Sequence, residues 1–264
     1  MQKIRQVTLS DLLKTYSHPS AALYRAIELR QIYEGCKEYK FLSPSLDIGS
    51  GDGKISSLLF NHRFTYGIDN GEANDYLESI KYKRYKKVFL ESAAKMSLLD
   101  NSVNFAFSNS VLEHIPNLRA VLKETSRVLN KGGYFVFTSP SKYFRDGTNI
   151  NPILNKIGIG WINKLYSRFR NNALNHYNLH DHKYYTKELK KYGFEVIDYS
   201  YAISESTLKL WDTMAIIIKI TAVFGINIEK EVTKYFLFSI RKHYRNSVTN
   251  KKIGMNLLIV AIKR

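Results

Sequence analysis

Three glycines at alternate positions, Gly49, Gly51 and Gly53, form the most distinctive short motif of the sequence, within SLDIGSGDGKIS (45–56). Glycine is costly to order on folding, and it is used where the backbone turns sharply or comes close to another group. A short apolar run precedes the motif, and Asp47 stands two residues before its first glycine. The spacing predicts a tight turn after a buried strand, with the backbone lying against a polar ligand.

Two common nucleotide-binding loops fit this motif poorly. A phosphate-binding P-loop needs glycine where Ile48 stands, and Ser or Thr where Ile55 stands. The dinucleotide fingerprint needs its third glycine where Lys54 stands, which disfavours a nicotinamide-dependent oxidoreductase. The remaining pattern, Asp-x-Gly-x-Gly-x-Gly at 47–53, resembles the first motif of class I methyltransferases that use S-adenosylmethionine (SAM).

Apolar strand-like segments alternate with helical ones along the chain, which predicts crossover units and a parallel sheet. Strands are expected at 44–49, 64–70, 86–92, 102–110, 133–140, 194–202 and 255–264, and helices at 54–62, 116–133, 161–170, 186–193 and within 204–245. The 116–133 helix is expected to end at its glycine pair. No Pro/Gly-rich linker divides the chain, so residues 1–264 are predicted to form one domain, with a cofactor-binding core at about 40–140 and cap insertions at about 141–182 and 204–245.

The resemblance to SAM-dependent methyltransferases extends beyond the glycines. Residues 91–117 (ESAAKMSLLDNSVNFAFSNSVLEHIPN) and 124–140 (ETSRVLNKGGYFVFTSP) are similar to the family in order and spacing, and 186–199 continue the match. The resemblance implies a doubly wound, Rossmann-like α/β fold. Its seven-stranded sheet would be mostly parallel, with an antiparallel last strand and helical insertions.

The resemblance also implies which residues bind SAM. The family places a carboxylate at the end of the second strand to accept both ribose hydroxyls, and Asp69 stands there. Asp47 would meet the methionyl ammonium through water. Ser92 replaces the acid that often reads adenine, so that contact passes to the backbone at Ala93. The implied set is Asp47, Gly49, Ser50, Gly51, Gly53, Asp69, Asn70, Ser92, Ala93, Met96, Asn109 and Ser110. For Met96, packing in the core is the alternative to lining the adenine slot.

Three histidines are candidates for taking a proton from the methyl acceptor, because imidazole titrates near neutral pH. His114 stands where a substrate would enter, and His176 and His182 lie in NHYNLHDHKYY (175–185). That stretch also holds a group of metal-ligating types: His176, His180, Asp181 and His182. Methyl transfer from a sulfonium does not require a metal, so none is predicted. Surface roles for these histidines remain the alternative.

The formal net charge of +17 favours an anionic partner, unless it only solvates a basic surface. Methyltransferases of nucleobase amines typically carry an (Asp/Asn)-Pro-Pro-aromatic turn after the fourth strand, where this chain has Ser108-Asn109-Ser110-Val111. Nucleic acid is therefore disfavoured as a partner. The cap insertions favour a small-molecule or glycan-type acceptor, methylated on oxygen. An RNA-directed methyltransferase and a cofactor-binding protein without turnover are the alternatives.

The single cysteine, Cys36, and the absence of an apolar leader in MQKIRQVTLSDLLK favour the cytoplasm. Residues 206–228 carry apolar side chains at helical spacing. They predict either a cap helix buried against the domain or a helix on a membrane surface, with Trp211 among the headgroups. In the second case the basic segment 229–264 would attract anionic lipid. The resulting hypothesis is an O-methyltransferase of glycan or glycolipid precursors that docks loosely on the inner leaflet.

Overall fold

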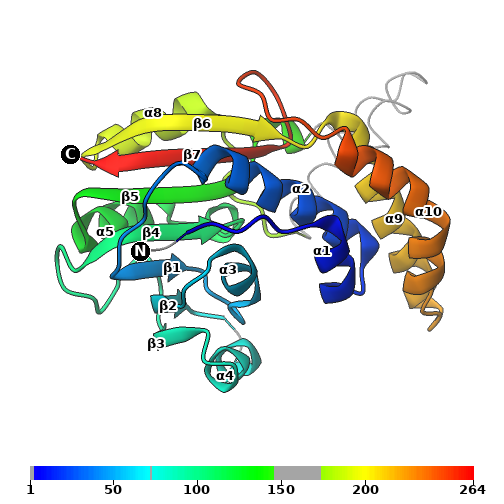
Figure 1. The fold of residues 1–264 in the computed structure, drawn as a ribbon, viewed down its shortest axis with the longest axis horizontal. Helices are drawn as coiled ribbons and strands as arrows, with labels where there is room; N and C mark the ends of the chain where they lie inside the picture. Colours follow the sequence, from blue (N-terminus) through cyan, green and yellow to red (C-terminus); the bar gives the residue numbers. More distant parts are fainter. Residues whose placement is uncertain (1–2, 72, 146–173) are drawn as a thin grey trace.

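The structure is a computed structural model that describes residues 3–71, 73–145 and 174–264 (Figure 1). Its strands are β1 (Ser45–Ile48), β2 (Phe64–Asp69), β3 (Tyr85–Leu90), β4 (Val103–Asn109), β5 (Leu129–Pro140), β6 (Phe194–Ala202) and β7 (Asn256–Lys263). They form one sheet in the order β3-β2-β1-β4-β5-β7-β6. Neighbours among β1 to β5 pair in parallel, and β7 is antiparallel to both β5 and β6. The predicted fold class is confirmed.

The helices account for the predicted helical segments that lie within the described residues, and they add others. They are α1 (Leu9–Thr15), α2 (Pro19–Cys36), α3 (Lys54–Leu59), α4 (Ala73–Lys81), α5 (Leu118–Val128), α8 (His182–Lys190), α9 (Glu205–Val223) and α10 (Glu229–Arg245), with short 3-10 turns η1 (Leu112–His114) and η2 (Lys142–Phe144). The sequence prediction did not include α1, α2 or α4. The helix predicted at 161–170 lies outside the described residues.

The predicted helix at 116–133 is too long. α5 ends at Val128, and Leu129 already pairs with Val103 as the first residue of β5. The register of β5 against β4 then shifts before it becomes regular again. A Cβ on Gly133 would lie 2.8 Å from the carbonyl oxygen of Asn130. The glycine pair therefore permits a bulge inside a strand and does not end the helix.

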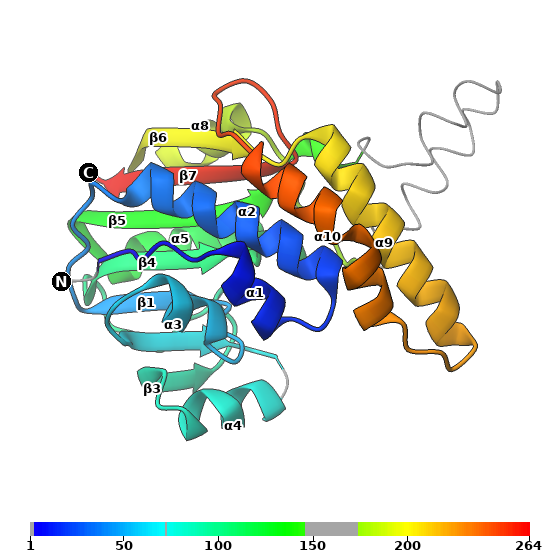
Figure 2. The ribbon, with the colours of Figure 1, turned by 45° about the vertical axis from the view of Figure 1, so that its right-hand side comes forward.

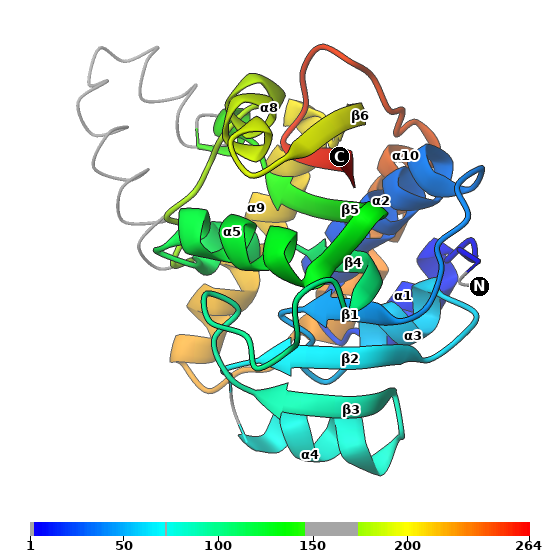
Figure 3. The same ribbon diagram turned by 90° about the vertical axis from the view of Figure 1, so that its left-hand side faces the viewer.

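Two hydrophobic cores lie on the two faces of the sheet (Figure 3). α1, α2 and α3 cover one face, and α5 and α8 cover the other. Successive residues of a strand point to opposite faces, so Phe105 and Phe107 of β4 pack in the first core and Ala106 packs in the second. This arrangement leaves the carboxyl ends of the parallel strands open for a binding site.

α9 and α10 form an antiparallel pair that packs on α2 and extends past the carboxyl ends of the parallel strands (Figure 2). Leu208, Met214 and Ile218 are buried, so α9 is a cap helix over this part of its length. Trp211 packs beside Tyr24 and Phe144, which favours the cap-helix alternative at this position. Within the described ranges, no helix combines the length and apolarity needed to cross a membrane.

Candidate active site

The glycine loop follows β1 and is held against β2. The backbone N–H groups of Gly49 and Ser50 both donate to the carbonyl oxygen of Ile68, at 2.8 and 3.1 Å. Gly49 has a φ of +72°, and a Cβ at this position would lie 2.3 Å from a methyl group of Val111. Only glycine fits here, both because of the left-handed backbone and because Val111 closes the space.

A cavity of about 470 Å³ opens beside this loop, at the carboxyl ends of β1 and β2. Five of the predicted cofactor-binding residues line it: Gly49, Asp69, Asn70, Ser92 and Ala93. The Asp69 carboxylate accepts the N–H of Gly51 at 2.7 Å with one oxygen and that of Gly71 at 2.7 Å with the other. Each carboxylate oxygen has a second lone pair, so Asp69 retains acceptor sites for a ribose diol.

Asp47 lies beneath the glycine loop and does not line the cavity. Its carboxylate accepts hydrogen bonds from the hydroxyl of Ser56 and, at 2.6 Å, from that of Tyr85. Burial raises the pKa of Asp47 to about 7. The Tyr85 ring also lies 2.6 Å from where a Cβ of Gly53 would be. Asp47 thus stabilises the loop through Ser56 and Tyr85, whereas the resemblance implies that Asp47 contacts the methionyl ammonium of SAM.

Met96 and Glu91 also bear on the predicted cofactor site. Met96 is 5% exposed and packs in the core beneath α5, as the alternative for this residue had it. Glu91, which the sequence analysis did not single out, lines the cavity next to Ser92. Its carboxylate accepts the N–H of Ser97 at 2.8 Å. An acidic residue at the end of the third strand was the signal that could have identified it.

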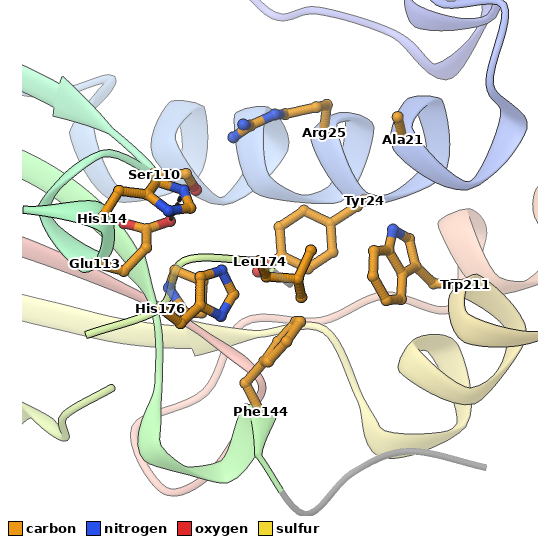
Figure 4. A pocket seen from close by; sticks show the side chains of 11 residues that line it. Ala21, Tyr24, Arg25, Ser110, Glu113, His114, Phe144, Leu174, His176 and Trp211 are labelled. Atoms are coloured by element: carbon orange, nitrogen blue, oxygen red, sulfur yellow. Dashed lines mark ion pairs between the residues drawn. The ribbon is translucent and has the colours of Figure 1, made fainter. Parts of the chain in front are cut away.

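A second cavity, of about 220 Å³, lies between α2, η1 and α9 (Figure 4). Tyr24, Phe144 and Trp211 give it aromatic walls. Its polar end is formed by Glu113, His114 and His176, and His114 also lines the larger cavity. The two cavities therefore share His114 as a lining residue, and we call this shared boundary the junction.

Glu113, His114 and His176 face one another at this junction. The ligating atoms of all three side chains lie within 4.8 Å of one another, and His114 Nε2 is 3.7 Å from Glu113 Oε1. Glu113 is 1% exposed, and burial raises the pKa of its carboxyl group to about 8. Burial also lowers the pKa of His114, so its imidazole is neutral at pH 7.

Backbone contacts hold His176 at this position. The N–H groups of Tyr177 and Asn178 donate to the carbonyl oxygen of Glu113 at 2.7 and 3.2 Å. The Asn178 side-chain amide donates to the carbonyl oxygens of Leu112 and Ile115. The chain around residue 176 is thereby fixed on η1, far from it in sequence.

His182, the third predicted catalytic histidine, is not part of this group. It begins α8, on the same face of the sheet as α5, and its Nδ1 lies 3.0 Å from the Tyr201 hydroxyl. Its ring stacks on Tyr199 with centroids 4.0 Å apart. His182 lines neither of the two cavities, so the structure brings together only two of the three predicted histidines.

Asn109 and Ser110 are held by α2 through a buried carboxylate. Glu28 is fully buried and accepts the hydroxyls of Ser110 at 2.6 Å and Thr138 at 2.8 Å, and the Arg25 guanidinium at 2.5 Å. The Asn109 amide donates to Thr138 at 2.6 Å. Arg25 and Ser110 both line the smaller cavity. α2 therefore contributes to the site, although the sequence analysis assigned it no role.

Comparison with known proteins gives a family and a fold. A family model described as a methyltransferase domain matches residues 3–199. A Thermotoga maritima SAM-dependent methyltransferase, described as a possible histamine N-methyltransferase, has a TM-score of 0.58 and 17% identity, over 93% of this chain and 91% of that one. A geranyl diphosphate methyltransferase in complex with SAM gives 0.54 and 14%, over 93% and 90%. No curated protein matches the chain by sequence.

The fold by itself does not identify a reaction. The [4+2]-cyclase SpnF has a TM-score of 0.55 and 13% identity, over 93% of this chain and 82% of that one. At such identities the structural likeness establishes the fold alone. The family match is of a different kind, because it spans most of the chain. It includes the glycine loop, Asp69 and the larger cavity, which fit the expected cofactor, SAM. The chain therefore belongs to the methyltransferase domain family and is a class I, SAM-dependent methyltransferase.

Proposed function

We propose that this enzyme methylates a hydroxyl oxygen of a small molecule or of a glycan or glycolipid precursor. The observation that carries the proposal is the position of His114, which lines both cavities. A donor in the larger cavity and an acceptor in the smaller one would meet beside this imidazole. Alignment of two reactants in this way is a major source of rate enhancement.

The larger cavity fits the donor, and the smaller one fits the acceptor. Bound beside Asp69, SAM supplies a methyl group on a cationic sulfur. His114 and His176 receive the acceptor hydroxyl by hydrogen bonding. The acceptor oxygen would bond the methyl carbon, the sulfur would keep the electron pair of the broken bond, and the His114 imidazole would take the hydroxyl proton.

The walls of the smaller cavity indicate the kind of acceptor. Tyr24, Phe144 and Trp211 offer apolar ring surface, while the polar groups gather at one end. Such a pocket suits a molecule with an apolar face, such as a sugar ring, and one hydroxyl directed at the histidines. The volume of about 220 Å³ suits a single ring or the terminal unit of a longer precursor.

The test compares matched acceptors. Sugars and phenols would be assayed with SAM against analogues that carry an amine in place of the hydroxyl, with the methylated atom located by mass spectrometry. The hydroxyl compounds should be methylated, and His114→Asn should lower kcat by about 100-fold or more. His62→Asn, an exposed histidine of the same chain, should leave the rate unchanged. Methylation confined to the amine analogues would exclude the proposal.

The proposal also places the enzyme in the cytoplasm, docked loosely on anionic lipid. At the turn between α9 and α10, Val223 is 82% and Phe224 is 75% exposed. Lys219, Lys230 and Lys234 are exposed close to this turn. An apolar tip with nearby lysines suits insertion into an anionic interface, although Glu229 and Glu231 at the start of α10 offset part of the attraction. In this proposal Val223 and Phe224, and not Trp211, insert among the lipid headgroups.

Vesicle flotation tests the docking. Recovery with anionic vesicles at low salt should fall at moderate salt, because the lipid charge is screened. The double variant Val223→Ser/Phe224→Ser should lose recovery. Val248→Ser, which alters an exposed apolar residue outside the α9–α10 pair, should keep it. No recovery of the unmodified protein at low salt would exclude docking and leave the enzymatic proposal standing.

A further inference from the structure

The junction of the two cavities holds a set of side chains suited to a metal ion. We infer that Glu113, His114 and His176 bind one first-row divalent cation there. Two imidazoles and one carboxylate are ligands that such ions share, and three protein ligands leave positions open for other ligands. Among the described residues, this is the group whose ligating atoms come close enough together, within 4.8 Å.

The His114 ring is oriented as a metal-binding histidine would be. Its Nδ1 lies 3.2 Å from the backbone carbonyl oxygen of Asn175. A carbonyl only accepts, so Nδ1 carries the proton and Nε2 presents its lone pair. A backbone carbonyl that fixes the second nitrogen in this way is typical of zinc-binding imidazoles.

The lone pair of His114 Nε2 faces a carboxylate oxygen with a gap between them. The distance from Nε2 to Glu113 Oε1 is 3.7 Å, which exceeds a hydrogen bond. Two metal–ligand bonds of about 2.1 Å span that distance. The other oxygen, Glu113 Oε2, is buried and has no hydrogen-bond partner among the described residues.

Within residues 3–71, 73–145 and 174–264, no lysine or arginine forms an ion pair with the buried Glu113 carboxylate. Arg25, which lines the same cavity, is paired with Glu28 at 2.5 Å. Burying an unpaired carboxylate is costly, and a divalent cation would remove that cost. The hydrogen bonds from Tyr177 and Asn178 to the η1 backbone place His176 at the same point before any ion arrives.

The cation would extend the proposed function, on which this step rests. An ion at the junction coordinates the acceptor oxygen itself and lowers the pKa of its hydroxyl group. In that case His114 and His176 hold the ion, and the ion activates the acceptor hydroxyl in their place. It favours acceptors with two neighbouring oxygens, such as a vicinal diol or a hydroxyl beside a carboxylate, which can chelate the ion.

The first experiment measures metal binding directly. Full-length protein, freed of any affinity tag and treated with a chelator, would be titrated with Zn²⁺ and with Mn²⁺ by calorimetry. We expect one ion per chain. Glu113→Gln and His176→Asn should each weaken binding by about 100-fold, because each removes one of three ligands. His182→Asn, an equally conservative change outside the group, should leave the affinity unchanged.

Binding of S-adenosylhomocysteine by each variant shows that it is folded, so loss of metal binding is not read from a misfolded protein. Equal Zn²⁺ affinity in the unmodified protein, Glu113→Gln and His176→Asn would overturn the inference, as would no binding at all. If the chelator-treated enzyme methylates hydroxyl acceptors at full rate, the proposed function stands, but the inferred role of the cation is rejected. If one ion binds at these residues but hydroxyl compounds are never methylated, the site stands and the proposed function fails.

Discussion

The space beside Gly49 in the cofactor loop is too small for a side chain. The cost of that steric clash can be measured separately from the cost of backbone strain. Gly49 and Gly132 have similar φ values, +72° and +77°, but a Cβ meets Val111 at 2.3 Å in the first case and nothing within 4 Å in the second. Gly132→Ala should therefore cost about 1 kcal/mol, from the left-handed backbone alone. Gly49→Ala should cost about 1–3 kcal/mol more and abolish binding of S-adenosylhomocysteine. Urea unfolding and calorimetry check both, and equal costs for the two variants would contradict the packing argument.

Asp47 should make the stability of the protein depend on pH. Its pKa is about 7 in the folded state, above the value of 3.8 for an unperturbed carboxyl group, because the side chain is buried. Between these values the native state keeps the proton that the unfolded state loses, so the free energy of unfolding falls as the pH rises from about 4 to about 7. Asp47→Asn lacks this titrating group. The free energy of unfolding of the unmodified protein should therefore fall by up to about 4 kcal/mol more than that of the variant over this pH range.

The measurement is urea unfolding of the unmodified protein and of Asp47→Asn at intervals from pH 4 to 8. The two stability curves should diverge up to about pH 7 and run parallel above it. Curves that stay parallel throughout would show that Asp47 has an ordinary pKa. Glu113, whose pKa is also raised, is present in both proteins and cancels in the comparison.

The two motif aspartates differ in how well the sequence predicts their roles. Asp69 ends β2, and the resemblance to the family implied its place in the cofactor cavity, which it lines. Asp47 lies inside β1, where Leu46 and Ile48 take the face under α5, so its own side chain must point to the opposite face. There it meets Tyr85 and Ser56, partners that only the folded chain brings together.

At the scale of elements, α2 joins the two strands that end at the active site. Glu28 links it to Ser110 after β4 and to Thr138 in β5. Glu28→Ala should cost about 3–5 kcal/mol, because it leaves Arg25 without its buried partner. Glu34→Ala removes a half-exposed carboxylate of the same helix and should change stability by about 0.5 kcal/mol or less. Denaturant unfolding of both variants tests this prediction. Equal losses of stability would show that Glu28 does not link α2 to the two strands.

The omission of α2 from the sequence prediction has a physical cause. α2 is covered by the sheet on one side and by α9 and α10 on the other, so its apolar residues do not keep to one stripe. The error at 116–133 arose because a glycine pair usually ends a helix, whereas here it forms a bulge in β5. Strands were predicted more accurately, since their continuous apolar runs reflect burial on both faces of a parallel sheet.

At the scale of the molecule, the cofactor cavity is built from β1, β2 and the turn after β4, so binding should stabilise the whole fold. S-adenosylhomocysteine at 100 times its Kd adds about 2.7 kcal/mol, which raises Tm by roughly 5–10 °C for a chain of this size. Calorimetry should show one transition that shifts as a whole, as expected if residues 1–264 form a single domain. Asp69→Asn at the same ligand concentration should shift less. A transition that splits, with one part unmoved, would indicate two independent units.

The acceptor side of the site was the least predictable part. His114 and His176 are 62 residues apart, and their meeting depends on hydrogen bonds from Tyr177 and Asn178 to η1. Glu113 was hidden in the LEHI stretch, because nothing in the sequence reveals that its carboxylate is buried at a junction. The cofactor side follows from a local motif, whereas the acceptor side requires long-range contacts that a single sequence does not display.

The place of β7 in the sheet has a consequence for synthesis of the protein. β7 lies between β5 and β6, although the ribosome makes it after both strands and after the whole of α9 and α10. Until it arrives, the nascent chain carries a finished glycine loop but leaves the outer edge of β5 and both edges of β6 unpaired. Open strand edges attract other chains, and a pairing that must wait for distant residues forms slowly. A pause in translation within α9 or α10 would therefore hold the chain in its most aggregation-prone form, with the cofactor loop complete and the sheet still divided.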